Sequence, residues 1–595
     1  EEEWLNPPTE QWLATTLTYD AYGNVVSVTD ALGRTTTNTY EATGTYLTQI
    51  ANALGHTRAL AYDPRFGQVT NSTDQNGQTT TTEYDALGRL TKVISPTDTA
   101  TLPAVSYAYD LSTVPIKTTV SIRIQSGAPE VLTSYTFTDG LGRAIQTRSP
   151  AENPTKQVVT GNVQFNARGL AVKQWVPYLD VTSTSYVPVT QITGLAPPVT
   201  YTYDPLGRTL TITDPDGSVT RTSYNDWVVT VTDANGHQTA RTSDTFGRLV
   251  KVQEFNGTEA YVTTYQYDTR HNLTKVTDHA GHVTTIAYDS LNRKLSMDDP
   301  DMGHWTYAYD ALDNLTSQTD ARGVVTSFAY DALNRLTQKS YTVPTGSGVA
   351  NPGAVTYRYD NPAKPFSKGK RTEITDGSGS SSFEYDALGR LVKESKTIDG
   401  TASTIQRTYD LLGRLTSLTH ADSEIASYTY NAQDGIETAK LQQGATQQTV
   451  VSDVSYNAAG QVTKIVYGNG AVSDYTYNPQ TLRLNALKTT GPSGTLQDFS
   501  YAFDLVGNVT AITDRVHTGT QTFQYDPLNR LKQATGSYGT STYAYDPTGN
   551  MTAKEGTTMT YGLPDGSKPH AVTSTSAGWT LTYDANGNLV KKVID

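Results

Sequence analysis

A seven-residue motif returns along almost the whole chain, and this repetition restricts the possible folds more than any other feature. The motif reads Tyr84-Asp85-Ala86-Leu87-Gly88-Arg89-Leu90, and the same residues stand at Tyr385-Asp386-Ala387-Leu388-Gly389-Arg390-Leu391. Near-copies stand at Tyr203-Asp204-Pro205-Leu206-Gly207-Arg208, Tyr330-Asp331-Ala332-Leu333-Asn334-Arg335, Tyr409-Asp410-Leu411-Leu412-Gly413-Arg414 and Tyr525-Asp526-Pro527-Leu528-Asn529-Arg530. Tandem copies predict a repeat architecture in which each copy is one supersecondary unit packed on its neighbours.

Each residue type in the motif suits one position of a β-hairpin turn. Tyr favours the end of a strand, and Asp opens a turn by accepting hydrogen bonds from the backbone that follows it. Gly or Asn then tolerates the positive φ that a hairpin loop of three to five residues requires. The motif therefore predicts a hairpin turn, which we call the YD corner. The residues assigned this structural role are Tyr19, Asp20, Tyr84, Asp85, Gly88, Arg89, Tyr203, Asp204, Gly207, Tyr309, Asp310, Tyr385, Asp386, Gly389, Tyr409, Asp410, Gly413, Tyr525 and Asp526.

The spacing of the YD corners predicts two strands per repeat. Tyr267, Tyr288, Tyr309 and Tyr330 stand 21 residues apart by subtraction of their numbers. A second corner lies between successive YD corners, as at Asp30-Ala31-Leu32-Gly33-Arg34 and Asp74-Gln75-Asn76-Gly77. Two strands of about six residues and two corners of about four to five residues account for this period.

An aromatic residue often precedes the motif tyrosine by two positions, which places both rings on one face of a sheet. One face is therefore expected to carry an aromatic stripe, and no useful helical periodicity competes with this pattern. The pairs are Tyr107/Tyr109, Tyr201/Tyr203, Tyr307/Tyr309, Phe328/Tyr330, Phe383/Tyr385, Tyr428/Tyr430, Phe523/Tyr525 and Tyr543/Tyr545.

The repeats divide the chain into four parts. Residues 1–16 form a lead-in, residues 17–110 carry regular repeats, residues 111–198 carry degenerate repeats with longer loops, and residues 199–595 are regular again. The degenerate part is either a domain boundary or a stretch of the same sheet with decorated turns, and we favour the second interpretation.

Composition decides what so many strands can build. Hydrophobic residues make up 36% of the chain and Tyr occurs 39 times, against about 45–50% apolar residues in ordinary domains. Such a chain makes sheet more easily than it fills a solid core. On the order of 45 strands at about 4.8 Å spacing give a ribbon roughly 200 Å long, and sheets beyond about 10 strands curl or split.

A ribbon that coils in about two turns has a diameter above roughly 30 Å, which side chains do not fill. We therefore predict an all-β fold in which tandem hairpins form one long antiparallel sheet that spirals into a hollow shell. A propeller would need about 12 blades against the usual 4–8. A leucine-rich repeat would need a leucine ladder, and a solid β-helix would need small core residues rather than paired tyrosines.

Charge and composition exclude several function classes. The net charge of −13 argues against nucleic-acid binding, because phosphate recognition needs a basic face. The chain has no cysteine, and no run approaches the 18 apolar residues of a membrane span. The start, Glu1-Glu2-Glu3-Trp4, lacks the shape of a signal peptide, so we expect an internal piece of a longer chain.

The search for chemistry finds no convincing active site. His271, Asp278, His279 and His282 have loosely metal-like spacing, but they fall across a predicted corner and three convergent ligands are required. Corners such as Asp233-Ala234-Asn235-Gly236 lack the clustered carboxylates that calcium needs. Known nucleophile, phosphate-loop and metalloprotease motifs are absent. We predict no enzyme activity and no catalytic, cofactor-binding or metal residues.

These repeats resemble the YD-repeat (RHS) family, which includes bacterial RHS toxins, the B and C subunits of insecticidal Tc toxin complexes and, more distantly, teneurins. Residues 17–34 look most like the middle of a Tc B subunit. Lys568-Pro569-His570-Ala571-Val572-Thr573 and Tyr583-Asp584-Ala585-Asn586-Gly587-Asn588 look like the segment before the family's RHS core domain. The resemblance implies a β-sheet cocoon that encloses a C-terminal toxic polypeptide, with other toxin-complex subunits as partners.

The family's core ends in an autoproteolytic site with an Asp-Pro-x-Gly signature. Asp204-Pro205-Leu206-Gly207 and Asp546-Pro547-Thr548-Gly549 match these letters but lie inside ordinary repeats, so we interpret them as turns. We expect the core and the toxin to lie outside residues 1–595. The first hypothesis is a non-catalytic encapsulating shell of a secreted bacterial toxin. The second is a YD-repeat protein of the bacterial cell surface for adhesion or carbohydrate binding.

Overall fold

The computed structural model describes residues 2–5 and 11–594, and this part of the chain forms 54 β-strands and one short 3-10 helix, η1 (Val189–Gln191). The all-β prediction is confirmed. The strands belong to a 2-stranded sheet, a 14-stranded sheet and a 38-stranded sheet. The smallest sheet pairs β1 (Glu2–Leu5) with β2 (Gln11–Ala14).

The 14-stranded sheet contains most of the strands of the first third of the chain. They are β3 (Thr16–Tyr19), β4 (Val25–Thr29), β5 (Thr35–Tyr40), β6 (Leu47–Ala51), β7 (Thr57–Asp63), β8 (Gln68–Thr73), β9 (Thr79–Tyr84), β10 (Leu90–Ile94), β11 (Val105–Asp110), β12 (Ile116–Arg123), β13 (Val131–Thr138), β14 (Ala144–Pro150), β15 (Lys156–Thr160) and β18 (Tyr178–Val181).

The 38-stranded sheet contains the remaining strands. It begins with β16 (Val163–Phe165), β17 (Ala171–Gln174), β19 (Val199–Tyr203), β20 (Thr209–Thr213), β21 (Val219–Asn225), β22 (Val228–Thr232), β23 (Gln238–Ser243), β24 (Leu249–Asn256), β25 (Glu259–Tyr267), β26 (Leu273–Thr277), β27 (Val283–Tyr288), β28 (Lys294–Asp299) and β29 (Gly303–Tyr309). It continues with β30 (Leu315–Thr319), β31 (Val325–Tyr330), β32 (Leu336–Thr342), β33 (Val355–Tyr359), β34 (Arg371–Asp376), β35 (Gly379–Tyr385), β36 (Leu391–Ile398), β37 (Thr401–Tyr409), β38 (Leu415–Thr419), β39 (Ile425–Tyr430), β40 (Ile436–Gln443) and β41 (Thr446–Tyr456). It ends with β42 (Val462–Tyr467), β43 (Val472–Tyr477), β44 (Leu484–Gly491), β45 (Gly494–Phe503), β46 (Val509–Asp514), β47 (Gly519–Tyr525), β48 (Leu531–Gly536), β49 (Gly539–Tyr545), β50 (Met551–Lys554), β51 (Thr557–Tyr561), β52 (Val572–Thr575), β53 (Trp579–Tyr583) and β54 (Leu589–Ile594).

The two kinds of corner differ in register. At the YD corner between β29 and β30, Tyr309 pairs with Leu315 while Ala308 pairs with Ser317, so one extra residue bulges on the return strand. At the second corner between β30 and β31 the pairing stays in step, from Thr319↔Val325 to Gln318↔Thr326. A bulge bends its strand and increases the local twist. Because the bulges gather along the edge that carries the YD corners, they favour a ribbon that curves.

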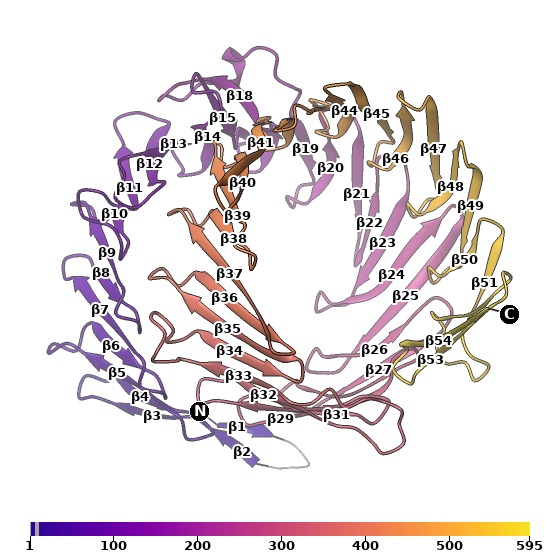
Figure 1. Cartoon of the computed structure of the whole chain (residues 1–595), viewed down its shortest axis with the longest axis horizontal. Helices are drawn as coiled ribbons and strands as arrows, with labels where there is room; N and C mark the ends of the chain where they lie inside the picture. Colours follow the sequence, from indigo (N-terminus) through magenta and orange to yellow (C-terminus); the bar gives the residue numbers. More distant parts are fainter. Residues whose placement is uncertain (1, 6–10, 595) are drawn as a thin grey trace.

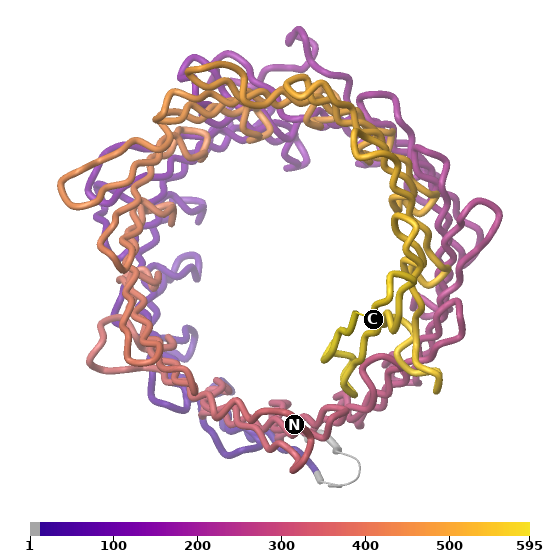
Figure 2. Tube along the Cα trace, turned by 45° about the vertical axis from the view of Figure 1, so that its right-hand side comes forward, coloured from indigo at the N-terminus to yellow at the C-terminus, as the bar shows by residue number. Residues whose placement is uncertain are grey.

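The ribbon coils into a ring-shaped wall of about two turns. Figures 1 and 2 show the orange-to-yellow half of the chain following the indigo-to-magenta half around a common open centre. Hydrogen bonds join the turns between residues far apart in sequence, such as Arg34 Nη1 to the Asp331 carbonyl at 2.7 Å and the Leu411 amide to the Ile124 carbonyl at 2.8 Å.

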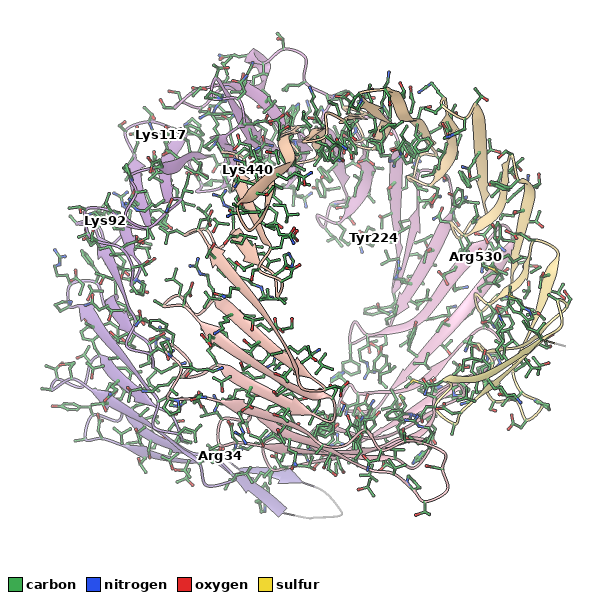
Figure 3. The ribbon with its side chains drawn as sticks, in the orientation of Figure 1. Arg34, Lys92, Lys117, Tyr224, Lys440 and Arg530 are labelled. Carbon is green, nitrogen blue, oxygen red and sulfur yellow. The ribbon has the colours of Figure 1, made fainter. Side chains whose placement is uncertain are left out.

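The wall is thin and has two exposed faces. The accessible surface of the chain is 31519 Å², whereas a compact protein of 64.5 kDa would expose about 20,000 Å². Most described strand residues are only half buried. The side chains drawn in Figure 3 follow the wall and leave the centre of the ring open. The surface excess is therefore the area expected when a sheet wraps a space instead of packing on a second layer.

Within the repeats, the prediction of one continuous sheet is wrong at one place. β15 pairs with β18, whereas β16 pairs with β17 and starts the 38-stranded sheet. The break lies inside the degenerate repeats of residues 111–198, so these repeats do more than decorate turns. The boundaries at 16/17, 110/111 and 198/199 stay a prediction.

Buried polar side chains hold the chain at this break. The Arg148 side chain is fully buried and binds the Asp180 carboxylate at 2.7 Å through Nη2 and the Gln157 amide oxygen at 2.9 Å through Nε. Gln146 Nε2 donates to Asn162 Oδ1 at 3.1 Å. Since buried polar groups must find partners, this network fixes β14, β15 and β18 to one another and to the Asn162 linker that leads into β16. Burial beside it raises the pKa of the Tyr178 hydroxyl to about 12.

Candidate functional site, the shell wall and its seam

The YD corner is held by the carboxylate of its aspartate. Asp85 Oδ1 accepts hydrogen bonds from the amides of Leu87 and Arg89 at 2.9 and 3.0 Å, and its Oδ2 accepts one from Arg89 Nε at 2.7 Å. Gly88 stands at φ 74°, in the left-handed region. The hydrogen bonds from the backbone and then the side chain of Arg89 keep the pKa of Asp85 below its usual value.

The same arginine joins one repeat to the next. The Arg89 guanidinium lies 4.4 Å from the centre of the Tyr109 ring, and the Tyr109 hydroxyl donates to the Leu90 carbonyl at 2.9 Å. Cation–ring contact and hydroxyl bond together clamp successive YD corners along one edge of the ribbon. The arginine–ring contact recurs at Arg143/Phe165, Arg208/Tyr224, Arg248/Tyr267, Arg293/Tyr309, Arg335/Tyr359, Arg390/Tyr409, Arg414/Tyr430, Arg483/Phe503 and Arg530/Tyr545.

The residues assigned to YD corners from sequence take similar positions. Asp204, Asp386, Asp410 and Asp526 each bind the arginine four residues later, and Asp20 and Asp310 each bind an asparagine there. Gly207, Gly389 and Gly413 all have positive φ. The hydroxyls of Tyr84, Tyr203, Tyr309, Tyr385, Tyr409 and Tyr525 each donate to a backbone carbonyl of the preceding repeat. Tyr19 differs, because 59% of it is exposed.

The first and fifth residues of the corner are related, a relation that was not predicted from the sequence. Corners with arginine at the fifth position begin with Asp, whereas the corners that begin at Asn431 and Asn457 have Gly435 and Gln461 there. Asn457 Nδ2 donates to Gln461 Oε1 at 2.9 Å, which replaces the ion pair by an amide pair. Arginine at the fifth position thus occurs together with Asp at the first, and this joint occurrence was the signal available in the sequence.

The seam between the two turns is built from corners. In the described part of the chain, strands pair only within a turn, and second corners of the first turn meet YD corners of the second turn. Arg34, labelled in Figure 3, binds Asn334 Oδ1 at 2.8 Å in addition to the Asp331 carbonyl. Asn235 Nδ2 donates to Asp504 Oδ2 at 3.0 Å. Other contacts join Asn76 to Lys368, Glu152 to Tyr456 and Asp320 to Asn586.

The histidine group proposed and rejected from sequence does not converge as a group of four. His271 packs edge-on against Phe246, and His279 Nδ1 lies 3.1 Å from the Val262 amide. Asp278 and His282, however, meet a residue of the next turn, His570. Asp278 and His282 thus gain a third possible ligand, His570, from the other side of the seam. This third residue could be identified only from the fold.

Both Asp-Pro-x-Gly sequences lie in ordinary corners. Asp204 Oδ1 accepts from the amides of Leu206 and Arg208, and Asp546 Oδ1 accepts from Thr548 and Asn550. These carboxylates hold turns in the same way as Asp85. Across residues 2–5 and 11–594, the structure contains no helix with the length and apolar character needed to traverse a bilayer.

Comparison with known proteins agrees with this geometry. The family model described as RHS Repeat matches residues 19–57, 62–100, 203–238, 244–278, 267–301 and 309–347, and the model described as Teneurin YD-shell matches residues 367–479. No curated protein matches the sequence with significance.

Several solved structures share the fold over 99% of the chain. Crystal structures of TcdB2-TccC3, with and without its hypervariable C-terminal region, superpose with a TM-score of 0.85 at 19% and 18% identity. A Photorhabdus luminescens Tc holotoxin pore matches with the same TM-score at 18% identity. The chain spans 37–39% of the length of these chains. At this identity the match establishes a common fold.

Proposed function

The chain belongs to the RHS/YD-repeat family, and from this membership we propose that it is a structural wall segment of a hollow shell that encloses a polypeptide. The observation that carries the proposal is the thin two-turn wall with its open centre (Figure 2). Its 31519 Å² of accessible surface exceeds that of a compact protein of this size, as expected for a wall with two open faces.

The wall suits enclosure because hydrogen bonds connect neighbouring strands within each turn and also connect one turn to the other. Strand pairing closes the backbone along each turn, and clamped YD corners fix one strand pair on the next. Seam contacts such as Asn235–Asp504 join the turns. A polypeptide inside would be separated from solvent and proteases by a layer of sheet, and holding it there requires no specific binding pocket.

The solved relatives support a proposal for the cargo and the partners. TcdB2-TccC3 has a hypervariable C-terminal region, and the Photorhabdus luminescens protein is part of a Tc holotoxin pore. We propose that the cargo of this shell is likewise a C-terminal toxic polypeptide, and that other toxin-complex subunits contact the wall. On this proposal the protein is secreted by a bacterium as part of a toxin. Catalysis, on this proposal, belongs to the cargo rather than to the wall.

The alternative hypothesis of an adhesive or carbohydrate-binding surface relied on the repeated tyrosines. In the wall several of these rings face arginines, as Tyr430 faces Arg414 at 4.5 Å, and their hydroxyls bind carbonyls. A tyrosine engaged on its ring and its hydroxyl is poorly placed to stack on a sugar. The tyrosines engaged in this way therefore give the alternative no support.

Protease protection tests the proposal. An unstructured segment with several trypsin sites is attached after Asp595 of the full chain, and the same segment is attached to a compact protein of similar size as the control. Enclosure predicts that the segment on the shell is cleaved more slowly, while a trypsin site placed in the exposed loop at residues 344–348 is cleaved at the control rate. Equal cleavage rates for the two attached segments would refute enclosure.

A further inference from the structure

Two aspartate–histidine pairs meet where the first and second turns touch. His282 Nδ1 lies 2.6 Å from Asp278 Oδ2 in the second corner between β26 and β27. His570, in the loop between β51 and β52, places Nδ1 2.6 Å from Asp301 Oδ2. The two imidazole rings lie 5.6 Å apart, centre to centre, at 77°. Residues separated by almost 300 positions in sequence therefore bring two imidazoles together.

The hydrogen bonds indicate which ring nitrogens face the site. His570 donates its Nδ1 hydrogen to Asp301, so the lone pair of the neutral ring is on Nε2. At His282 the nitrogen beside the Asp278 carboxylate is Nδ1, and an ion shared with Asp278 would bind there in place of the hydrogen between the two residues. His570 Nε2 lies 3.7 Å from Asp278 Oδ2, which is too long for a hydrogen bond. Two ligands of one tetrahedral zinc ion with bonds of about 2.0–2.1 Å lie about 3.3 Å apart. The separation is thus closer to that of two metal ligands than to that of a bonded pair.

We propose that Asp278, His282 and His570 bind one divalent transition-metal ion, zinc by preference, and that this ion joins the two turns of the wall. One ligand atom from each of the three residues lies within 4.8 Å of the others. Two histidines and one carboxylate are an established zinc ligand set that leaves the fourth position to water. Imidazole ligands also disfavour calcium and magnesium, which require oxygen.

Asp301 is the positioning residue of this site. Metal-bound histidines usually donate their other N–H to a carboxylate, which orients the ring and raises its basicity. Asp301 does this for His570 and also accepts the His570 backbone amide on Oδ1 at 3.0 Å. The Asp278 and Asp301 carboxylates give this point of the seam negative charge that favours a cation, offset in part by the Lys568 ammonium beside Asp301.

The loop that carries His570 is held without the metal. The Lys568 amide donates to the Pro300 carbonyl at 2.9 Å, and Lys568 Nζ donates to the carbonyls of Asp301 and Ala585. Only 6% of Lys568 is exposed. The third ligand is therefore pre-positioned against the corner of the first turn, which reduces the ordering that metal binding would require.

Zinc binding to the full metal-free chain tests the site. ZnCl2 is titrated in competition with a chromogenic chelator, and one equivalent is expected to bind. H570Q and H282Q remove one ligand each from opposite turns, and each is expected to weaken binding at least about 100-fold. D301N leaves all three ligands and is expected to weaken binding by about 10–100-fold. The matched control is H517Q, because His517 pairs with Asp514 at 2.8 Å in an exposed corner and has no second imidazole beside it.

A spectroscopic measurement separates this site from scattered surface histidines. Co²⁺ in place of zinc should give the intense visible absorption of a four-coordinate ion in the wild type and in H517Q, and lose it in H570Q and H282Q. Circular dichroism of the metal-free variants checks that the sheet is intact. Equal zinc affinity in wild type, H570Q and H282Q, or an equal loss in H517Q, would overturn the proposal. Either result leaves the enclosure experiment unaffected.

Discussion

The Asp–Arg pair of the corner at Asp289 allows a quantitative test of the rule that matches the first and fifth residues. Asp289 Oδ2 accepts from Arg293 Nε at 2.7 Å, and the two side chains are only 2% and 9% exposed. The D289N side chain has the same shape as aspartate, but it presents an amide N–H₂ group or a neutral oxygen to the Arg293 guanidinium. A hydrogen bond to a charged group contributes about 1.5–3 kcal/mol, so we expect a loss of about 2 kcal/mol in local stability.

The compensating change is R293Q, which recreates the amide pair found at Asn457 and Gln461. R293Q alone also loses the contacts of Arg293 with the Asp310 carbonyl and the Asp313 carboxylate, and we expect it to cost about 2 kcal/mol. The double variant D289N/R293Q should cost about 2–3 kcal/mol rather than the sum. The coupling energy is then about 1–2 kcal/mol, in the range measured for residues in contact.

Hydrogen exchange is the suitable assay, because repeat proteins open locally and a global unfolding energy is poorly defined for them. The reporters are the amides of Leu291 and Arg293, which both donate to Asp289 Oδ1 at 2.9 Å. A loss of 2 kcal/mol accelerates their exchange about 30-fold. D310N is the control, since Asn314 can present its amide oxygen instead and the cost should stay below about 1 kcal/mol. Additive costs in the double variant, or wild-type exchange in D289N, would contradict the reasoning.

Three further predictions concern the same corners. Y330F removes the 2.9 Å hydrogen bond from the Tyr330 hydroxyl to the Leu315 carbonyl. It should reduce the local stability of β30 and β31, measured by amide hydrogen exchange, by about 0.5–1.5 kcal/mol. Unchanged exchange rates would show that this hydrogen bond does not stabilise the wall. G413A should lower the free energy of unfolding by about 1 kcal/mol, because Gly413 has φ +83° although no atom lies near its missing Cβ. G413N should lower it less, since Asn334 occupies the equivalent position at φ 59°. The melting temperatures of the two variants test this order. The pKa of Asp85 is lowered by the backbone and then the side chain of Arg89, and that of Asp139 first by the side chain of Arg143. Because the folded pKa is lower than the unfolded value, this stabilisation is complete above about pH 4 and is lost as the pH falls through the folded values; urea midpoints that decline between pH 7 and 5 instead would argue against it.

The local structure could be predicted from sequence because each corner is determined by nearby residues. Asp85 binds amides two and four residues away, and Gly88 supplies the positive φ in the same turn. Contacts of this kind recur in most repeats, and the all-β fold follows from them together with the composition. Family membership could be recognised for the same reason.

The long-range contacts could not be predicted, because the residues that make them are not distinctive. Asn235 binds Asp504 across the seam, but Asn and Asp occur in many corners and nothing in either residue selects its partner. For the same reason, His570 could not be identified from sequence as a neighbour of Asp278. The sheet break was missed because buried Asn162 and Gln146 resemble ordinary polar loop and strand residues until their surroundings are known.

The unlike edges of the ribbon give it a polarity, like that of a screw thread. YD corners occupy one edge and second corners the other, and the seam is formed by one kind meeting the other. Losing or gaining a single strand would send every later YD corner to the opposite edge, where it would face corners of its own kind. The shell can therefore change length only by whole hairpins, and a second copy of it could extend the wall only head to tail.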